Sequence, residues 1–388
     1  MTSQWFYVAL FAASIAIVIV AEGRSLLRSM RKFALRPAAA FIGFGAFVSV
    51  LFSQRPSLSI FAYGCFIAII GFGAFADTVF ERKRVQAATS FVIALGALVL
   101  AVRVLLWRAG EGLDVSAFHI GNNAWLGKLQ IAWVLNLMAP FLLVRFFDRR
   151  SAVAWGFYAL AWLASATAVH YVYSRTGTLA FVLTTFLICA TNLRYWRRWL
   201  SLLAVMSVCG VIVVSNGAGI SERVVASIMR ADRDEGIVWR QGVWRATLPM
   251  VRDHPLAGIG LGAYDDVAFS QYHFDADPHF FRNGWHAHNV FLHVLAETGI
   301  IGLAAWCYLW LAIVVFLIGR WRHGGESERL NSAATLGVVI AFLVLSLTEV
   351  LIAARVHASL RMNLTLVLLL VYGCGLASPA RGEQTANT

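Results

Sequence analysis

The chain has 388 residues, of which 60% are hydrophobic and only 13% charged, and its mean hydropathy of +0.71 lies far above that of soluble domains. The formal net charge is +12, yet the one long hydrophilic segment, 215–287, carries seven arginines against nine acidic residues. The positive excess therefore belongs to short connections between apolar stretches, and we expect no nucleic-acid partner and no soluble mature form.

Apolar stretches of about 16 to 22 residues recur along the chain, and about 20 residues are needed to cross a bilayer as helix. The N-terminal stretch lacks the features of a cleaved signal peptide, so we expect it to be a retained span. The sequence predicts an all-α integral membrane protein, a polytopic bundle of about 11 transmembrane helices. The expected spans lie near 5–21, 38–53, 58–76, 87–106, 129–146, 153–172, 177–193, 199–214, 289–318, 331–351 and 360–377.

Basic clusters occur in every second connection, and the positive-inside rule places them all in the cytoplasm. These clusters are Arg24 to Arg36, Arg82 to Arg84, Arg145 to Arg150, Arg194 to Arg198 and Arg320 to Arg329. The long hydrophilic segment then faces outward. We therefore expect four parts: N-terminal membrane helices in 1–214, about eight of them; an external loop with short helices in 215–288; about three further membrane helices in 289–377; and a cytoplasmic tail in 378–388.

Within the long loop, the segment IVWRQGVWRATLPMVRDH predicts a helix that ends before Pro255. Arg240 and Trp244 are four residues apart and share one face of it. The following PLAGIGLGAY contains glycines that permit tight turns. Although GIGLG superficially resembles a phosphate-binding glycine loop, it follows a helix instead of a strand, and we expect no dinucleotide site.

Four ionisable residues, Arg103, Arg175, Glu297 and Glu349, map to the outer half of the bilayer on this topology. Such residues are costly in a membrane and usually face a cavity or a partner. Each one taken singly is equally consistent with a snorkelling or structurally paired side chain. Their shared side predicts a polar cavity that opens outward beneath the long loop.

Six of the ten histidines lie between residues 254 and 293, so metal binding has to be considered. Possible ligands are His273, Asp275, Asp277, His279 and the two histidines of WHAHN. No ligand spacing held on a helix, such as HExxH, is present in the segment. We therefore expect neither a functional metal nor another cofactor.

The segment HAHNVFLHVLAETGIIGL opens the span 289–318, which is about 45 Å long as helix and must project beyond the hydrocarbon. His288 is thus expected at the outer mouth of the membrane. Asn289, His293 and Glu297 follow at spacings of four and form a polar stripe on one helix face. An interfacial histidine above a helix-packing stripe explains the same pattern without any chemistry.

These residues resemble the O-antigen ligase and polymerase superfamily, whose signature is a His, then Asn, Ser or Gln, nine residues, Gly, two residues, and Gly, Thr or Tyr. His288, Asn289, Gly299 and Gly302 satisfy it in full. Upstream, Arg240 and Trp244 followed by HPLAGIGLGAY, and the SRTG turn at 174–177, are similar to two further stretches of that family. The resemblance implies a GT-C-like bundle of typically 12 spans, one more than we find here.

The resemblance implies a metal-independent glycosyltransferase in the bacterial inner membrane, with its active site facing the periplasm. Such an enzyme moves a glycan from undecaprenyl diphosphate to an acceptor hydroxyl, either on lipid A core (a ligase) or on a growing O-antigen or exopolysaccharide chain (a polymerase). His288 is then the catalytic base and Arg175 and Arg240 bind the diphosphate. Asn289, His293 and Glu297 are supporting residues.

Two alternative functions that are not enzymatic remain open. A polysaccharide or lipid transporter also needs a polar intramembrane cavity, although the ionisable residues gather on the outer side and do not run through the midplane. A membrane scaffold of a polysaccharide assembly complex would bind a partner through the long loop, and His288 would be replaceable. A protein-targeting oligosaccharyltransferase is less expected, because the extra C-terminal sequence usual in such members is absent from this sequence.

Overall fold

The computed structural model describes residues 36–80, 83–111, 128–148, 152–172, 174–192, 200, 235–272, 286–350 and 365–374. Every regular element within these ranges is a helix. Five of the described helices contain windows long and apolar enough to cross a membrane: Pro56–Gly73, Arg84–Trp107, Leu129–Phe147, Val290–His323 and Glu326–Leu345. The predicted all-helical, multi-pass membrane fold is confirmed in these parts, whereas the spans expected near 5–21 and, apart from residue 200, 199–214 lie outside them.

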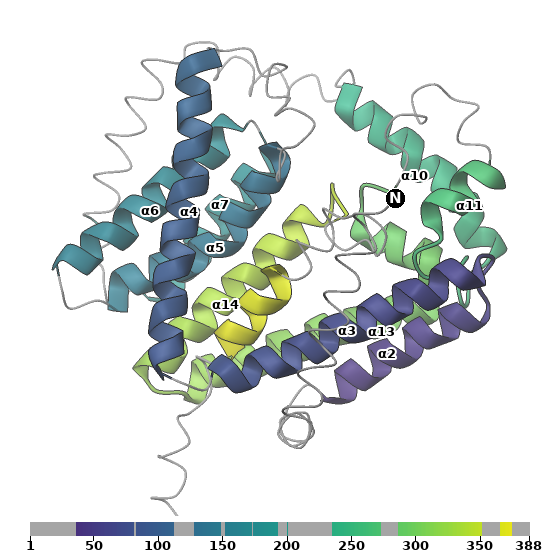
Figure 1. Cartoon of the computed structure of the whole chain (residues 1–388), viewed down its shortest axis with the longest axis horizontal. Helices are drawn as coiled ribbons and strands as arrows, with labels where there is room; N and C mark the ends of the chain where they lie inside the picture. The colour runs from purple at the N-terminus through teal and green to yellow at the C-terminus, as the bar shows by residue number, and fades with distance from the viewer. Residues whose placement is uncertain are drawn as a thin grey trace, which may run out of the picture.

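One group of helices comprises α2 (Arg36–Leu51), α3 (Pro56–Phe80) and α13 (Val290–His323). In Figure 1, α2 runs alongside α13 and is followed by the long helix α3. A Cβ atom on Gly45 would lie 3.2 Å from the Cα of Gly302, so the two backbones approach closely where α2 crosses α13. Small residues at a crossing permit such contact and are typical of membrane helix pairs.

The second group comprises α4 (Lys83–Glu111), α5 (Lys128–Asp148), α6 (Ala152–Tyr171), α7 (Arg175–Thr191) and α14 (Glu326–Leu345). Helix α4 packs against α5 and α6, while α14 packs against α5 and α7. Most of α5 and α14 is buried, and a large cluster of apolar side chains, including Trp162 and Phe342, forms the core. These two helices are therefore interior helices of the bundle.

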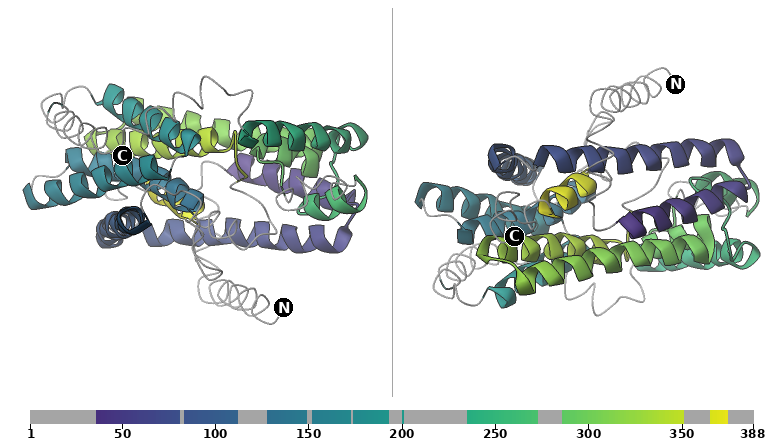
Figure 2. Two further views of the ribbon diagram at one scale, coloured as in Figure 1. Left: turned by 90° about the horizontal axis from the view of Figure 1, so that it is seen from above. Right: turned by 90° about the horizontal axis from the view of Figure 1, so that it is seen from below.

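An outer unit is formed by α10 (Glu235–Asp253), α11 (Tyr264–Ser270) and the turn between them. Both views in Figure 2 place it at one end of the molecule, beside the ends of α2 and α3 where these two helices are connected. The unit has its own small core, which includes Met250 and Tyr264. The predicted loop helix is confirmed, since α10 ends before Pro255.

The span predicted as one continuous helix over 289–318 is interrupted, and this is a correction to the sequence-based expectation. Within α13, Gly299 has φ 63° and ψ −168°, which breaks the helix. The turn between α10 and α11 packs against this break. The backbone N–H groups of Ile259 and Gly260 donate to the carbonyls of Ala296 and Glu297, at 3.0 Å each. Backbone groups that the break releases are thus bonded again, as burial requires.

The same break is closed from its other side by Ile300, whose N–H donates to the carbonyl of Pro255 at 2.9 Å. A Cβ atom on Gly299 would lie 2.2 Å from the carbonyl oxygen of Leu256, and one on Gly258 would lie 2.3 Å from that of Glu297. Both glycines also have φ near +70°, a region that residues with a Cβ rarely adopt. The glycine pattern therefore serves backbone docking between the outer unit and α13.

One predicted boundary also shifts. Helix α14 ends at Leu345, six residues before the expected end of the span at 351. As a consequence, Glu349 lies in the connection that follows α14 and not in a membrane helix. The described helix Thr365–Cys374 lies within the expected span 360–377, whose ends are outside the described residues.

Candidate active site

The four residues that follow α14, Ser346 to Glu349, contact several elements of the site, and we call them the hub segment. The N–H of Val290, the first residue of α13, donates to the carbonyl of Ser346 at 2.9 Å. The side-chain amide of Asn289 donates to the carbonyl of Leu347 at 3.2 Å. These two bonds hold the start of α13, and therefore His288, beside the hub segment.

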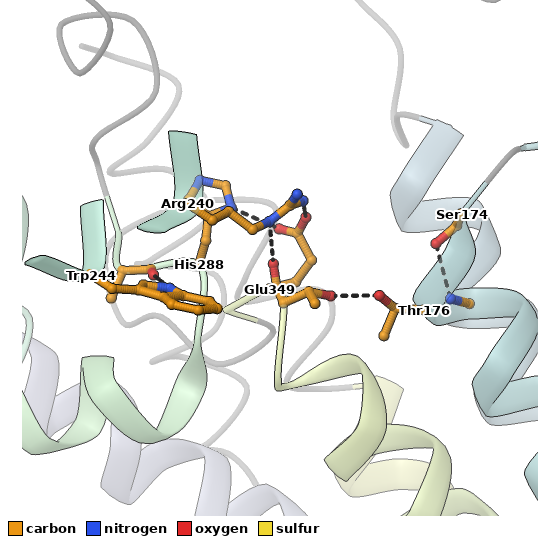
Figure 3. A network of polar contacts seen from close by, with 9 residues as sticks. Ser174, Thr176, Arg240, Trp244, His288 and Glu349 are labelled. Atoms are coloured by element: carbon orange, nitrogen blue, oxygen red, sulfur yellow. Dashed lines mark hydrogen bonds and ion pairs between the residues drawn. The ribbon is translucent and has the colours of Figure 1, made fainter. Parts of the chain in front are cut away.

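Arg240 on α10 reaches the hub segment with two of its nitrogens (Figure 3). Its Nε donates to the carbonyl of Thr348 at 3.1 Å, and one terminal nitrogen lies 2.9 Å from Oε1 of Glu349. The Glu349 side chain is only 9% exposed, whereas that of Arg240 is 24% exposed. The pair is thus a largely buried ion pair with the arginine on its accessible side.

His288 lies on the other side of the same carboxylate. Its Nδ1 is 3.2 Å from Oε2 of Glu349, so one carboxylate joins His288 and Arg240. Trp244, one turn beyond Arg240 on α10, donates from its indole nitrogen to the carbonyl of Ala287 at 2.9 Å. The expectation that Arg240 and Trp244 share a face is confirmed, because both point toward the residues around His288.

The backbone and ring of His288 are held in an unusual position. Its φ of 48° is in the left-handed region, which is uncommon for a residue with a Cβ and persists only where the surroundings hold it. The ring packs edge-on against Trp239 at 4.5 Å and against His286 at 4.0 Å between centroids. Strained residues of this kind concentrate at functional sites.

Electrostatics of the group follow from burial and from the charges beside it. Burial raises the pKa of Glu349, but the hydrogen bond and charge of His288 and the guanidinium of Arg240 together lower that pKa below its ordinary value. Burial, followed by the charge of His288, lowers the pKa of His286 to about 4. At neutral pH the carboxylate is therefore ionised and the His286 ring is uncharged.

The SRTG turn reaches the hub segment as well. Helix α7 begins at Arg175, and the Ser174 hydroxyl caps it by accepting from the N–H of Gly177 at 3.0 Å. The hydroxyl of Thr348 donates to that of Thr176 at 3.0 Å (Figure 3). The residue beside Thr176, Arg175, is exposed. The structure thus brings all three sequence motifs to one place.

The three predicted supporting residues divide into two sets. Asn289 caps α13 by accepting from the N–H of Leu292 at 3.0 Å. His293 and Glu297 are buried farther along the helix, 3.6 Å apart, and Glu297 accepts from the N–H of Tyr264 at 3.1 Å. His293 and Glu297 therefore contact Tyr264 of the outer unit, and neither of them is among the described residues that contact the hub segment.

The four ionisable residues assigned to one cavity do not all meet. Arg103 is exposed on α4, which packs against α5 and α6, and Glu297 lies under the outer unit. Glu349 contacts both Arg240 and His288, yet the sequence did not predict it as a catalytic or binding residue. An acidic residue at the end of an apolar stretch is the feature that could have pointed to it. His286 was considered in the sequence only as a possible metal ligand, and Trp239 gave no distinct signal, since its neighbours in space come from other elements.

A group able to hold a metal ion exists at this same place. The nearest ligand atoms of His286, His288 and Glu349 all lie within 4.8 Å of one another. Two imidazoles and a carboxylate are a donor set that suits zinc. The guanidinium of Arg240 already contributes a positive charge to the carboxylate. Both histidines of WHAHN, which the sequence offered as possible ligands, belong to this group. The other residues considered, His273, Asp275, Asp277 and His279, lie outside the described residues.

Comparison with known proteins shows which proteins this part of the chain is similar to. The model of the O-antigen ligase family matches residues 159–307, a stretch that includes the SRTG turn, Arg240 and His288. The exopolysaccharide production protein ExoQ of Rhizobium meliloti (strain 1021) is 27% identical over 128 residues, 32% of this chain and 29% of that protein, so the match spans less than a third of the relative's length.

Among solved structures, a chain of a peptidoglycan synthase complex that coordinates polymerization and crosslinking is similar with a TM-score of 0.47 and 16% identity, over 86% of this chain and 95% of that one. The match of residues 159–307 to the O-antigen ligase family model, together with the similarity to ExoQ, confirms the superfamily resemblance that the motifs predicted.

Proposed function

We propose that this protein is an O-antigen ligase-like glycosyltransferase, which moves a glycan from undecaprenyl diphosphate to an acceptor hydroxyl of lipid A core. The observation that carries the proposal is the Glu349 carboxylate, which joins the arginine and the histidine of two separate family motifs. A base and a cation held by one carboxylate are the two groups that transfer from a diphosphate leaving group requires.

In this proposal His288 removes the acceptor proton. Its Nδ1 is engaged by Glu349, which orients the ring, and Nε2 is assigned as the atom that accepts the proton. The acceptor oxygen forms its bond to the anomeric carbon as the bond from that carbon to the diphosphate oxygen breaks. The bonding electrons leave with the diphosphate, and the acceptor proton ends on Nε2.

The departing diphosphate carries the negative charge that develops in this step. Arg240 and Arg175 are assigned to bind it, because guanidinium groups remain charged and form paired hydrogen bonds with phosphate oxygens. Arg175 is the first residue of α7, where the helix dipole adds a partial positive charge. With this charge available, the reaction needs no metal ion.

A second candidate function is a polymerase that extends O-antigen or exopolysaccharide chains on the same lipid carrier. The similarity to ExoQ, whose name links it to exopolysaccharide production, favours this alternative. Both functions use the same donor and the same site residues. They differ only in the acceptor, which is lipid A core for the ligase and a lipid-linked glycan for the polymerase.

The arrangement in the membrane is part of the proposal. We place the outer unit and the hub segment at the periplasmic face of the bacterial inner membrane, within a GT-C-like bundle of about 11 spans. The periplasmic loop is assigned to 215–288, between membrane helices in 1–214 and in 289–377, with a cytoplasmic tail in 378–388. The basic residues in alternate connections support this orientation.

The test is transfer in reconstituted liposomes from an undecaprenyl diphosphate oligosaccharide, with lipid A core present or omitted. The wild type is compared with His288→Ala and with His323→Ala, an exposed histidine at the opposite end of α13. We expect His288→Ala to lose transfer by about 10²- to 10⁴-fold, the usual contribution of a general base, and His323→Ala to retain it.

The outcomes separate the functions. Product only with core present identifies a ligase, and chain growth without core identifies a polymerase. Full activity in His288→Ala would contradict the assigned base. Absence of any His288-dependent product with either acceptor would favour a transporter or a scaffold instead.

A further inference from the structure

Thr348 makes two contacts that no catalytic role assigned so far requires. Its hydroxyl donates to the hydroxyl of Thr176 at 3.0 Å, while its carbonyl accepts from Nε of Arg240 at 3.1 Å. Thr176 follows Arg175 directly in the chain, and Thr348 precedes Glu349. Hydrogen bonds therefore run from Arg240 through Thr348 to Thr176, which is the chain neighbour of Arg175, the second arginine assigned to the diphosphate. Figure 3 shows the contact at Thr176.

The Thr176 hydroxyl is not needed to begin α7, because Ser174 already caps that helix through the N–H of Gly177. Both threonines are β-branched, so their side chains have few rotamers and hold their hydroxyls in fixed positions. The contact is partly buried and joins residues 172 positions apart in the chain. It thus fixes the start of α7 against the residue that binds Arg240.

We propose that the Thr176–Thr348 hydrogen bond sets the spacing of Arg175 and Arg240, and that this spacing selects a diphosphate over a monophosphate. The inference rests on the proposed function. A diphosphate carries its charge on two linked phosphoryl groups and is bound best by two cations at a fixed separation. A monophosphate needs only one of them. The two threonines are positioning residues, which act through the arginines beside them.

The first experiment uses the full-length protein in liposomes with Thr176→Val and Thr348→Val, which keep the shape and remove the hydroxyl. We expect the KM for the lipid diphosphate donor to rise about three- to tenfold, the effect of losing one hydrogen bond, with little change in kcat. Inhibition by pyrophosphate should weaken more than inhibition by inorganic phosphate. The double variant should be no worse than either single one, because both changes break one contact.

Two controls make the readout specific. Thr→Ser at either position restores the hydroxyl and should restore the wild-type KM. Thr167→Val removes a hydroxyl that bonds only within α6, to the carbonyl of Leu163, and should leave the KM unchanged. Serine variants that behave like valine variants would overturn the proposal, as would an unchanged donor KM, an additive double variant, or a fall in kcat alone.

The contact itself is tested without any substrate. Thr176→Cys combined with Thr348→Cys should form a disulfide under mild copper oxidation, whereas Thr178→Cys with Thr348→Cys should not, because residue 178 lies on another face of α7. Absence of the first cross-link would overturn the contact. A cross-link that forms in a protein whose wild type is insensitive to both pyrophosphate and phosphate would overturn the diphosphate assignment, and the positioning role with it.

Discussion

Glu349 stands between the two side chains to which we assign chemistry, 2.9 Å from Arg240 and 3.2 Å from His288. A carboxylate in this position restricts the tautomer and orientation of the histidine. It also accepts one of the two hydrogen bonds that the Arg240 guanidinium makes to the hub segment. Its role can be separated from the roles of its partners because glutamine preserves the size and removes the charge.

We predict that Glu349→Gln lowers transfer about ten- to hundredfold. A hydrogen bond to a charged group contributes about 1.5–3 kcal/mol, and each 1.4 kcal/mol changes a rate about tenfold. The measurement is kcat for transfer in liposomes, with Glu328→Gln as the control, since Glu328 pairs with Arg320 at the other end of the bundle. Equal rates for Glu349→Gln and wild type would remove Glu349 from the site.

The same carboxylate predicts a pH dependence of stability. The pKa of Glu349 is lowered in the folded protein, so its contribution is fully present above the ordinary glutamate pKa of about 4.3 and is lost as pH falls through the lower folded value. We expect the Tm of the detergent-solubilised wild type to exceed that of Glu349→Gln at neutral pH, and the difference to shrink as pH falls below the ordinary glutamate pKa and to disappear below the lowered folded pKa. A Tm difference that does not change as the pH is lowered would contradict the ionised carboxylate.

Arg240→Lys is expected to weaken donor binding although the charge is kept. Arg240 uses Nε and a terminal nitrogen on two acceptors, and a single ammonium cannot reproduce this fork. The donor KM should rise by about tenfold, the effect of losing one charge-assisted bond. Arg245→Lys, on the exposed face of the same helix, serves as the control. Similar values for both variants would show that charge alone suffices.

At the scale of elements, the site depends on the break in α13. The break bends the helix where the turn of the outer unit docks, and the docked turn positions α10, which carries Arg240. The glycines of PLAGIGLGAY and Gly299, the first glycine of the family signature, thus form the two sides of one backbone contact. Because they are about 40 residues apart in the sequence, spacing alone does not predict this contact.

Gly299→Ala should therefore destabilise the outer unit. The new Cβ would meet the Leu256 carbonyl at 2.2 Å in a backbone conformation with φ +63°, and such strain costs about 1–3 kcal/mol or more. Gly319→Ala, in the same helix with nothing within 4 Å of the added atom, should be neutral or stabilising. Limited proteolysis of the outer unit and Tm check this. Equal protease resistance in the two variants would show that the break tolerates a side chain.

At the scale of the whole molecule, the proposed chemistry depends on fixed charges that come from α7, α10 and the hub segment. We predict that exhaustive chelation leaves transfer unchanged, since arginines supply the positive charge. The measurement is transfer after dialysis against a chelator, with and without added zinc. Loss of activity that zinc restores would instead assign a metal to His286, His288 and Glu349.

The sequence by itself determined the membrane-spanning helices, because a chain that crosses lipid must satisfy its backbone within each apolar segment, and such segments are visible locally. It also determined that Arg240 and Trp244 share a face, and it predicted a site at the motif around His288, since spacing on one helix and a family signature are local as well. Only the tertiary structure decided that Glu349 joins Arg240 to His288 and that α13 breaks at Gly299. Both depend on contacts between segments distant in sequence, and no local pattern of burial or charge specifies which partners will meet.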